Sequence, residues 1–141
     1  MRRYLLPITL GVLVIATVNP ASADSPLRTI QFQNPAAIIV GTWRSGNFAF
    51  TFSGDGTYVY VGAMGGSFMR TQSSESGTYT VAGDTLTVQR KNGVLTTSQN
   101  YRQDLGPSIT VYRWRFGNTP TGPALQLVYP NGGTQIFYRG E

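Results

Sequence analysis

The chain has 141 residues, of which 11 are basic and 6 acidic, and it contains neither histidine nor cysteine. Without these two residue types there is no disulfide and no Ser-His-Asp or Cys-His catalytic system. Nearly all zinc and copper sites are excluded as well. The composition therefore predicts a domain that is held together by packing alone and that uses no metal or cofactor.

Residues 1–23 have the features of a signal peptide. Two arginines follow the first methionine, an apolar stretch covers residues 4–18, and Ala21-Ser22-Ala23 supplies the small residues of a signal peptidase site. The apolar stretch contains a proline and is shorter than the ~20 residues of a spanning helix. We therefore expect cleavage to leave 118 of the 141 residues, and the mature protein to be exported to the periplasm or the medium.

The residues that follow predict strands and turns, with no helix of useful length. Residues 24–36 contain two prolines and no sustained period, which is typical of a tail or a lead-in strand. A first strand is expected over residues 38–44. Residues 48–52 (FAFTF) alternate large and small side chains, and the Ser-Gly-Asp-Gly sequence at 53–56 predicts a tight turn into a strand at 57–61.

The same unit recurs along the middle of the chain. Strands are expected at 77–81 and 85–88, on either side of Ala82-Gly83-Asp84. The Asn-Gly step in Lys91-Asn92-Gly93 predicts a third hairpin turn. Residues 62–74 are the least regular and are expected to hold at most one short strand, around Phe68.

The last third of the chain continues the pattern. We expect a polar strand over residues 94–103, the longest strand over 108–116, a loop over 117–123, and strands over 124–129 and 134–139. About eight to nine strands at spacings of roughly 8–12 residues are typical of sandwiches and barrels. Since short turns make sequence neighbours pair, the prediction is an all-β, antiparallel up-and-down meander over residues 37–141 that closes into a small barrel.

A family resemblance accompanies this pattern. Gly41-Thr42-Trp43, followed by the aromatic alternation and the Gly-Asp-Gly turn, resembles the opening of a lipocalin-like (calycin) barrel. The resemblance implies that Trp43 lies across the barrel floor beneath an arginine from the last strand, and Arg139 is in the matching position. Stacking of a guanidinium on an indole is worth about 0.5–2 kcal/mol. Both residues would then be structural.

The segment over residues 112–116 is the candidate ligand-binding surface. In a strand, Tyr112, Trp114 and Phe116 point to one side, and Arg113 and Arg115 point to the other. One interpretation places the aromatic rings in the cavity, where they stack on a flat or apolar ligand. A second places the arginines inside, facing an anionic head group. A third makes the rings ordinary core residues and the arginines solvated ones.

The acidic residues do not predict a catalytic site. The six acidic residues lie at the termini, in glycine turns or in polar runs, and no pair of carboxylates is expected to share a strand face. A surplus of three basic residues after cleavage is too small to predict nucleic-acid binding. The strands are too short to predict stable insertion into a membrane. We expect a non-catalytic binding protein for a small hydrophobic or amphiphilic ligand. The alternative is a cell-envelope protein–protein interaction module, such as a small β-barrel protease inhibitor.

Overall fold

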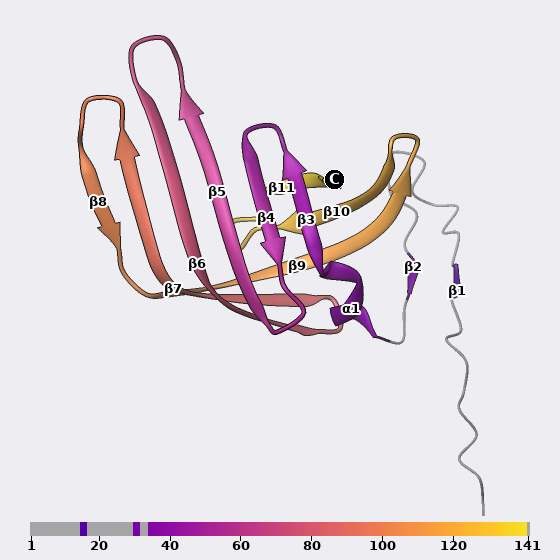
Figure 1. Ribbon diagram of the computed structural model, residues 1–141. Helices are drawn as coiled ribbons and strands as arrows, with labels where there is room; N and C mark the ends of the chain where they lie inside the picture. The colour runs from indigo at the N-terminus through magenta and orange to yellow at the C-terminus, as the bar shows by residue number, and fades with distance from the viewer. Residues whose placement is uncertain (1–14, 17–29, 32–33, 141) are drawn as a thin grey trace, which may run out of the picture.

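The computed structural model describes residues 15–16, 30–31 and 34–140 (Figure 1). Most of the expected signal peptide and most of the expected tail lie outside the described residues. Two short strands, β1 (Ile15–Ala16) and β2 (Ile30–Gln31), pair antiparallel with each other. From residue 34 onward the structure is one short helix followed by nine strands.

The elements of this region are α1 (Pro35–Ile39), β3 (Gly41–Ser45), β4 (Phe48–Phe52), β5 (Thr57–Gly65), β6 (Arg70–Ala82), β7 (Thr85–Thr97), β8 (Arg102–Leu105), β9 (Ser108–Thr119), β10 (Gly122–Val128) and β11 (Thr134–Arg139).

The sheet closes on itself. The strand order is β6-β5-β4-β3-β11-β10-β9-β7-β8, and β6 also pairs with β7, so eight strands form a closed ring to which β8 is added. Every pairing is antiparallel. The predicted all-β, up-and-down barrel of eight to nine strands is therefore confirmed. Closure removes the unpaired edges that an open eight-stranded sheet would expose.

The expected start of the first barrel strand was wrong. Residues 38 and 39 belong to α1, and β3 begins only at Gly41. Pro35 stands in the first helical turn, where its fixed φ suits a helix and its missing N–H is not needed. Ile39 is buried, so the short turn of helix places an apolar side chain against the end of the barrel that an extended chain would have left open.

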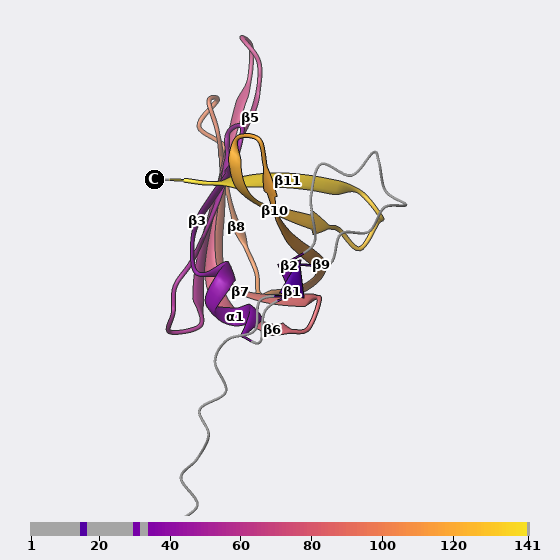
Figure 2. The same ribbon diagram turned by 90° about the vertical axis from the view of Figure 1, so that its right-hand side faces the viewer.

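Four of the strands extend beyond the barrel. β6 and β7 have 13 residues each, and only residues 85–90 of β7 pair with β9. Residues 93–96 of β7 pair instead with β8. Figures 1 and 2 show the β5–β6 and β7–β8 hairpins rising past the other strands. We call residues 63–74 and 93–105 the hairpin extension.

The expected turn at Lys91-Asn92-Gly93 was also wrong, because these residues lie inside β7 at a bulge. Ser76 pairs with Asn92 while Gly77 pairs with Arg90, so Lys91 is an extra residue. The backbones approach closely here: a Cβ on Gly77 would overlap the carbonyl oxygen of Gln89. Asn92 and Gly93 pair with Ser76 and Glu75 of β6, and the chain reverses later, near Asn100 with φ of 63°.

Three further boundaries differ from expectation. β5 runs to Gly65 and β6 starts at Arg70, so Phe68 lies in the connecting turn, 96% exposed, and not in a strand. The expected polar strand over 94–103 is divided between β7, a turn and β8. The expected loop over 117–123 is a tight turn, because β9 extends to Thr119 and β10 begins at Gly122. In the first and third cases cross-strand pairing extends a strand past the local signal that predicted its end.

The barrel interior is packed mainly with aromatic rings. Phe50 lies at the centre of this packing, with ring centroids 5.4 Å from Phe52, 5.5 Å from Phe137 and 6.4 Å from Tyr112. These rings come from β4, β11 and β9, so aromatic contacts join opposite walls of the barrel. The buried cluster is Ile39, Trp43, Phe50, Phe52, Tyr58, Tyr79, Leu86, Val88, Tyr112, Trp114, Leu125, Leu127 and Phe137.

Candidate functional site

The end of the barrel next to α1 is sealed. The indole Nε1 of Trp43 donates to the carbonyl oxygen of Ile39 at 2.7 Å, and the guanidinium carbon of Arg139 lies 4.6 Å from the Trp43 ring centroid. Arg139 Nη2 also donates to the carbonyl oxygens of Ile38 and Val40, at 2.9 and 3.1 Å. The structure thus brings together the two residues that the resemblance pairs. Their polar groups are occupied in closing the floor.

The candidate strand turns its rings inward. Tyr112 and Trp114 are buried, and Phe116 is half-buried with its ring edge-on to Trp43 at 5.9 Å. Arg113 and Arg115 are exposed on the outside, and Arg113 pairs with Asp84 at 2.7 Å. The structure therefore does not bring the two arginines to the interior, and an anionic head group inside the barrel would not meet them.

One polar atom of this strand lacks a partner. The indole Nε1 of Trp114 is buried and makes no hydrogen bond to any described residue. An unpaired buried donor costs about 1–3 kcal/mol. Trp114 lies on the same face of β9 as Tyr112 and Phe116, between them. The unpaired N–H therefore lies at an intermediate depth between the sealed floor and the other end of the barrel.

Four tyrosines lie near one another in the barrel, and we call them the tyrosine cluster: Tyr58, Tyr60, Tyr112 and Tyr129. The Tyr112 and Tyr129 rings lie 5.3 Å apart and edge-on, and Tyr60 lies 4.6 Å from Phe50. Phe48 stacks on Tyr60 at 6.3 Å. Tyr60, Tyr129 and Phe48 are only half-buried, and Phe48 and Tyr129 lie at the ends of β4 and β10 away from α1, so the end opposite α1, the tyrosine end, also presents aromatic surface.

An ion pair lies beside the tyrosine cluster. Glu75 on β6 and Arg90 on β7 are 3.0 Å apart, with only 17% and 23% of their side chains exposed. Arg90 Nε donates to the carbonyl oxygen of Gly106 at 2.8 Å, and the Tyr58 hydroxyl donates to Glu75 at 3.4 Å. Arg90 faces the inner side of β7 because it continues the alternation of the buried Leu86 and Val88, one residue before the bulge at Lys91. The pair is therefore built into the barrel wall.

The phenols of this cluster are held in their neutral form. Burial, with Tyr129 and Glu75 adding to it, raises the pKa of Tyr60 to about 12. Burial and then the Glu75 carboxylate raise the pKa of Tyr58 well above its usual value, and burial with Tyr129 does the same for the pKa of Tyr112. Neutral phenols keep their O–H donors, so the cluster can donate hydrogen bonds at any physiological pH.

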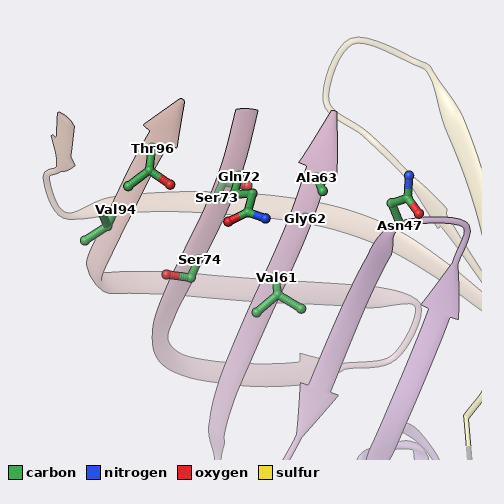
Figure 3. Close-up of a pocket in the computed structure, with 9 residues that line it drawn as sticks. All are labelled: Asn47, Val61, Gly62, Ala63, Gln72, Ser73, Ser74, Val94 and Thr96. Atoms are coloured by element: carbon green, nitrogen blue, oxygen red, sulfur yellow. The ribbon is translucent and has the colours of Figure 1, made fainter. Parts of the chain in front are cut away.

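A shallow hollow of about 320 Å³ lies on the outer face of the sheet (Figure 3). Side chains of Val61, Ser74 and Val94 project into it from three neighbouring strands, and Asn47 lies at one end. Its lining is uncharged and mostly small: Asn47, Val61, Gly62, Ala63, Gln72, Ser73, Ser74, Val94 and Thr96. This surface has neither the aromatic rings nor the ion pair of the barrel end.

The carboxylates of the described chain are dispersed. Asp55 accepts from the N–H and hydroxyl of Thr57 at 3.0 and 2.6 Å, which lowers the pKa of its carboxyl, and the Arg113 guanidinium lowers the pKa of Asp84. No three His, Cys, Asp or Glu side chains within the described ranges come close enough to hold a metal ion. No described helix has the length and apolarity needed to span a membrane. Glu75 is the carboxylate nearest the barrel interior.

Five residues of the candidate site were not predicted from the sequence: Glu75, Arg90, Tyr58, Tyr60 and Tyr129. The sequence contains a signal for two of them. Glu75 is an even number of residues from the buried Tyr79, and Arg90 is an even number of residues from the buried Leu86 and Val88, so both face inward along their strands. Charged residues at inward-facing positions of a strand are candidates for a buried pair. Comparison of the chain with protein families, with curated proteins and with solved structures finds no match.

Proposed function

We propose that this protein is an exported, non-catalytic binding protein that holds a small amphiphilic ligand inside the barrel, against Trp114 and the tyrosine cluster. The observation that carries the proposal is the buried indole N–H of Trp114, which has no partner among the described residues. A ligand with a carbonyl, carboxylate or ether oxygen would supply the missing acceptor. This contact would turn an unfavourable feature of the empty barrel into part of its affinity.

The direction of entry follows from the asymmetry of the barrel. The end next to α1 is closed by Trp43, Arg139 and the helix. The other end has half-buried rings of Phe48, Tyr60 and Tyr129. A ligand would therefore enter from the tyrosine end and reach inward to the Trp114 N–H. Rigid aromatic rings provide contact area at a small entropic cost.

The ligand chemistry follows from the groups at that end. Stacked and edge-on rings favour a flat or apolar body. The Glu75–Arg90 pair leaves Arg90 Nη2 without a hydrogen bond among the described residues, so this nitrogen is available to a polar head group. Because the interior is closely packed with rings, the ligand must be small, and side chains of the tyrosine cluster must move to admit it.

The test compares Trp114→Phe with the wild type. Phenylalanine keeps an aromatic ring and removes the N–H, so we expect any small molecule that native mass spectrometry finds on protein from its own host to be lost. We also expect the dissociation constant for anilinonaphthalene sulfonate to rise about three- to tenfold, the equivalent of one hydrogen bond.

Tyr138→Phe is the matched control, because Tyr138 is an aromatic residue on the outside of the barrel and 43% exposed. It should retain the molecule and bind the probe like the wild type. Absence of any retained small molecule, together with equal probe affinity in all three proteins, would count against the proposal.

A second function is favoured by a different observation, the apolar tip of the hairpin extension. Met64, Phe68, Met69 and Tyr101 are exposed, with Phe68 at 96%. Such a cluster at the end of a protruding sheet is typical of a protein contact. It supports the alternative of a cell-envelope interaction module. Phe68→Ser with Met69→Ser should then abolish capture of one defined envelope protein, and Ile109→Ser with Val111→Ser, at exposed positions on β9, should not.

A further inference from the structure

The outer edge of β8 is open. β8 is the last strand in the sheet order and pairs with β7 alone. Figure 1 shows it at the margin of the molecule, with no described strand on its other side. Its register is known from the β7 pairing: Thr96 lies opposite Arg102, Leu95 opposite Gln103 and Val94 opposite Asp104.

The hydrogen bonds of this pairing determine which groups face outward. Thr97 N donates to the carbonyl oxygen of Tyr101 at 2.9 Å. Hydrogen-bonded and non-hydrogen-bonded pairs alternate along an antiparallel ladder, so the backbone groups of Gln103 also point toward β7. Those of Arg102 and Asp104 point to the open edge. The edge therefore offers two N–H donors and two carbonyl acceptors.

We propose that β8 pairs antiparallel with β8 of a second copy of this chain, about a two-fold axis at Gln103. In that register Arg102 lies opposite Asp104 of the second copy, and Asp104 lies opposite its Arg102. These two pairs are the ones whose backbone groups face outward, so four N–H···O=C bonds form between the copies. The two Gln103 residues face each other in a non-hydrogen-bonded pair.

The side chains are self-complementary on both faces of the joined sheet. Arg102 and Asp104 lie on one face, where opposite charges directly across an antiparallel pair attract. On the other face, Tyr101 lies opposite Leu105 of the second copy, which joins a ring that is 54% exposed to an aliphatic side chain. A two-fold contact requires a sequence that is complementary to itself about its centre, and Tyr-Arg-Gln-Asp-Leu is complementary to itself about Gln103.

The charges of β8 do not block this pairing. Charged side chains on an edge strand usually oppose pairing because like charges meet. Here Arg102 and Asp104 have opposite charges, so the second copy places a residue of opposite charge across from each of them. Within one chain Arg102 and Asp104 are 3.5 Å apart, at 67% and 80% side-chain exposure. A pair so exposed is weak, so it can re-form between copies at little cost.

The test uses charge reversal and analytical ultracentrifugation at low ionic strength. The edge contact is small, so we expect a weak, concentration-dependent dimer and extend the measurement to about 1 mM protein, where a contact of roughly 4 kcal/mol is detected. In the Arg102→Asp variant, positions 102 and 104 are both acidic, so acidic residues of the two copies face each other. In the Asp104→Arg variant, both positions are basic, so basic residues face each other. Each should weaken self-association about tenfold or more.

Mixing the two single variants restores complementarity, because two aspartates then face two arginines. We expect the mixture to form a heterodimer, and the double variant Arg102→Asp with Asp104→Arg to self-associate like the wild type. Arg115→Asp, an equal change of charge at an exposed position on β9, should leave association unchanged.

A backbone readout separates β8 pairing from contact elsewhere. Amide hydrogen exchange of Arg102 and Asp104 should slow as the concentration of the wild type rises. A wild type that stays monomeric to the highest concentration would overturn the proposal. So would single variants that associate like the wild type, or unchanged exchange at these two amides in a dimer. The inference is independent of ligand binding, since β8 lies outside the barrel.

Discussion

The two tryptophans of this chain lie inside one barrel and differ in the contacts of their indole rings. Trp43 is 0% exposed and its N–H donates to Ile39 at 2.7 Å, beneath the Arg139 guanidinium. Trp114 is 7% exposed and its N–H has no partner among the described residues. Both rings are buried, so burial alone does not distinguish them. The hydrogen-bonding state of the N–H does, and it is the reason for proposing a ligand at Trp114 and not at Trp43.

The largest effect is expected at the sealed end. Trp43→Phe removes the hydrogen bond to Ile39, leaves a buried carbonyl without its donor and weakens the stack under Arg139. We expect the free energy of unfolding to fall by about 2–4 kcal/mol. Urea denaturation followed by circular dichroism measures it. A loss below that of the same substitution at position 114 would contradict the comparison.

The second effect concerns the ion pair at the other end. Arg90→Met removes the partner of a carboxylate that is only 17% exposed, and we expect a loss of about 1–3 kcal/mol. Glu75→Gln combined with Arg90→Met should recover most of it, because no unpaired charge is left. Equal stabilities of the single and double variants would show that the pair contributes nothing.

A third, smaller effect appears at alkaline pH. Burial is the main cause that raises the pKa of Tyr60 from 10.0 to about 12. The folded protein therefore binds the phenol proton of Tyr60 more tightly than the unfolded chain does. Its contribution to stability is complete below about pH 10 and is lost as the pH rises through 12. Tyr60→Phe removes this term. In urea denaturation at a series of pH values, the variant should lose less stability than the wild type across this interval.

The smallest effect is expected from Trp114→Phe. This substitution removes a buried donor that has no partner among the described residues, so little is lost apart from part of the ring. We expect the free energy of unfolding to change by less than about 1 kcal/mol, in either direction. A loss as large as that of Trp43→Phe would reveal a structural hydrogen bond at Trp114 and weaken the case for a ligand there.

Local patterns were enough to predict the barrel itself. The alternation at β4 and the glycine turn after it describe one hairpin without reference to the rest of the chain. The parity of residues 112–116 correctly placed the rings on one side and the arginines on the other, but left open which side faces inward. These signals are short in range, because a strand alternates its side chains every second residue and a tight turn needs residues that tolerate positive φ.

The tertiary structure decided the features on which the proposed function depends. The Asn-Gly step of residues 92–93 pairs with β6 and lies within β7 instead of forming a turn, and the pairing of β6 with β7 brings Arg90 to Glu75, 15 positions earlier in the chain. The unpaired N–H of Trp114 depends on which acceptors other strands bring near it. Sequence determined where strands form and which side chains share a face. Pairing between distant strands determined which polar groups find partners, since hydrogen bonds depend on distances that the local pattern does not contain.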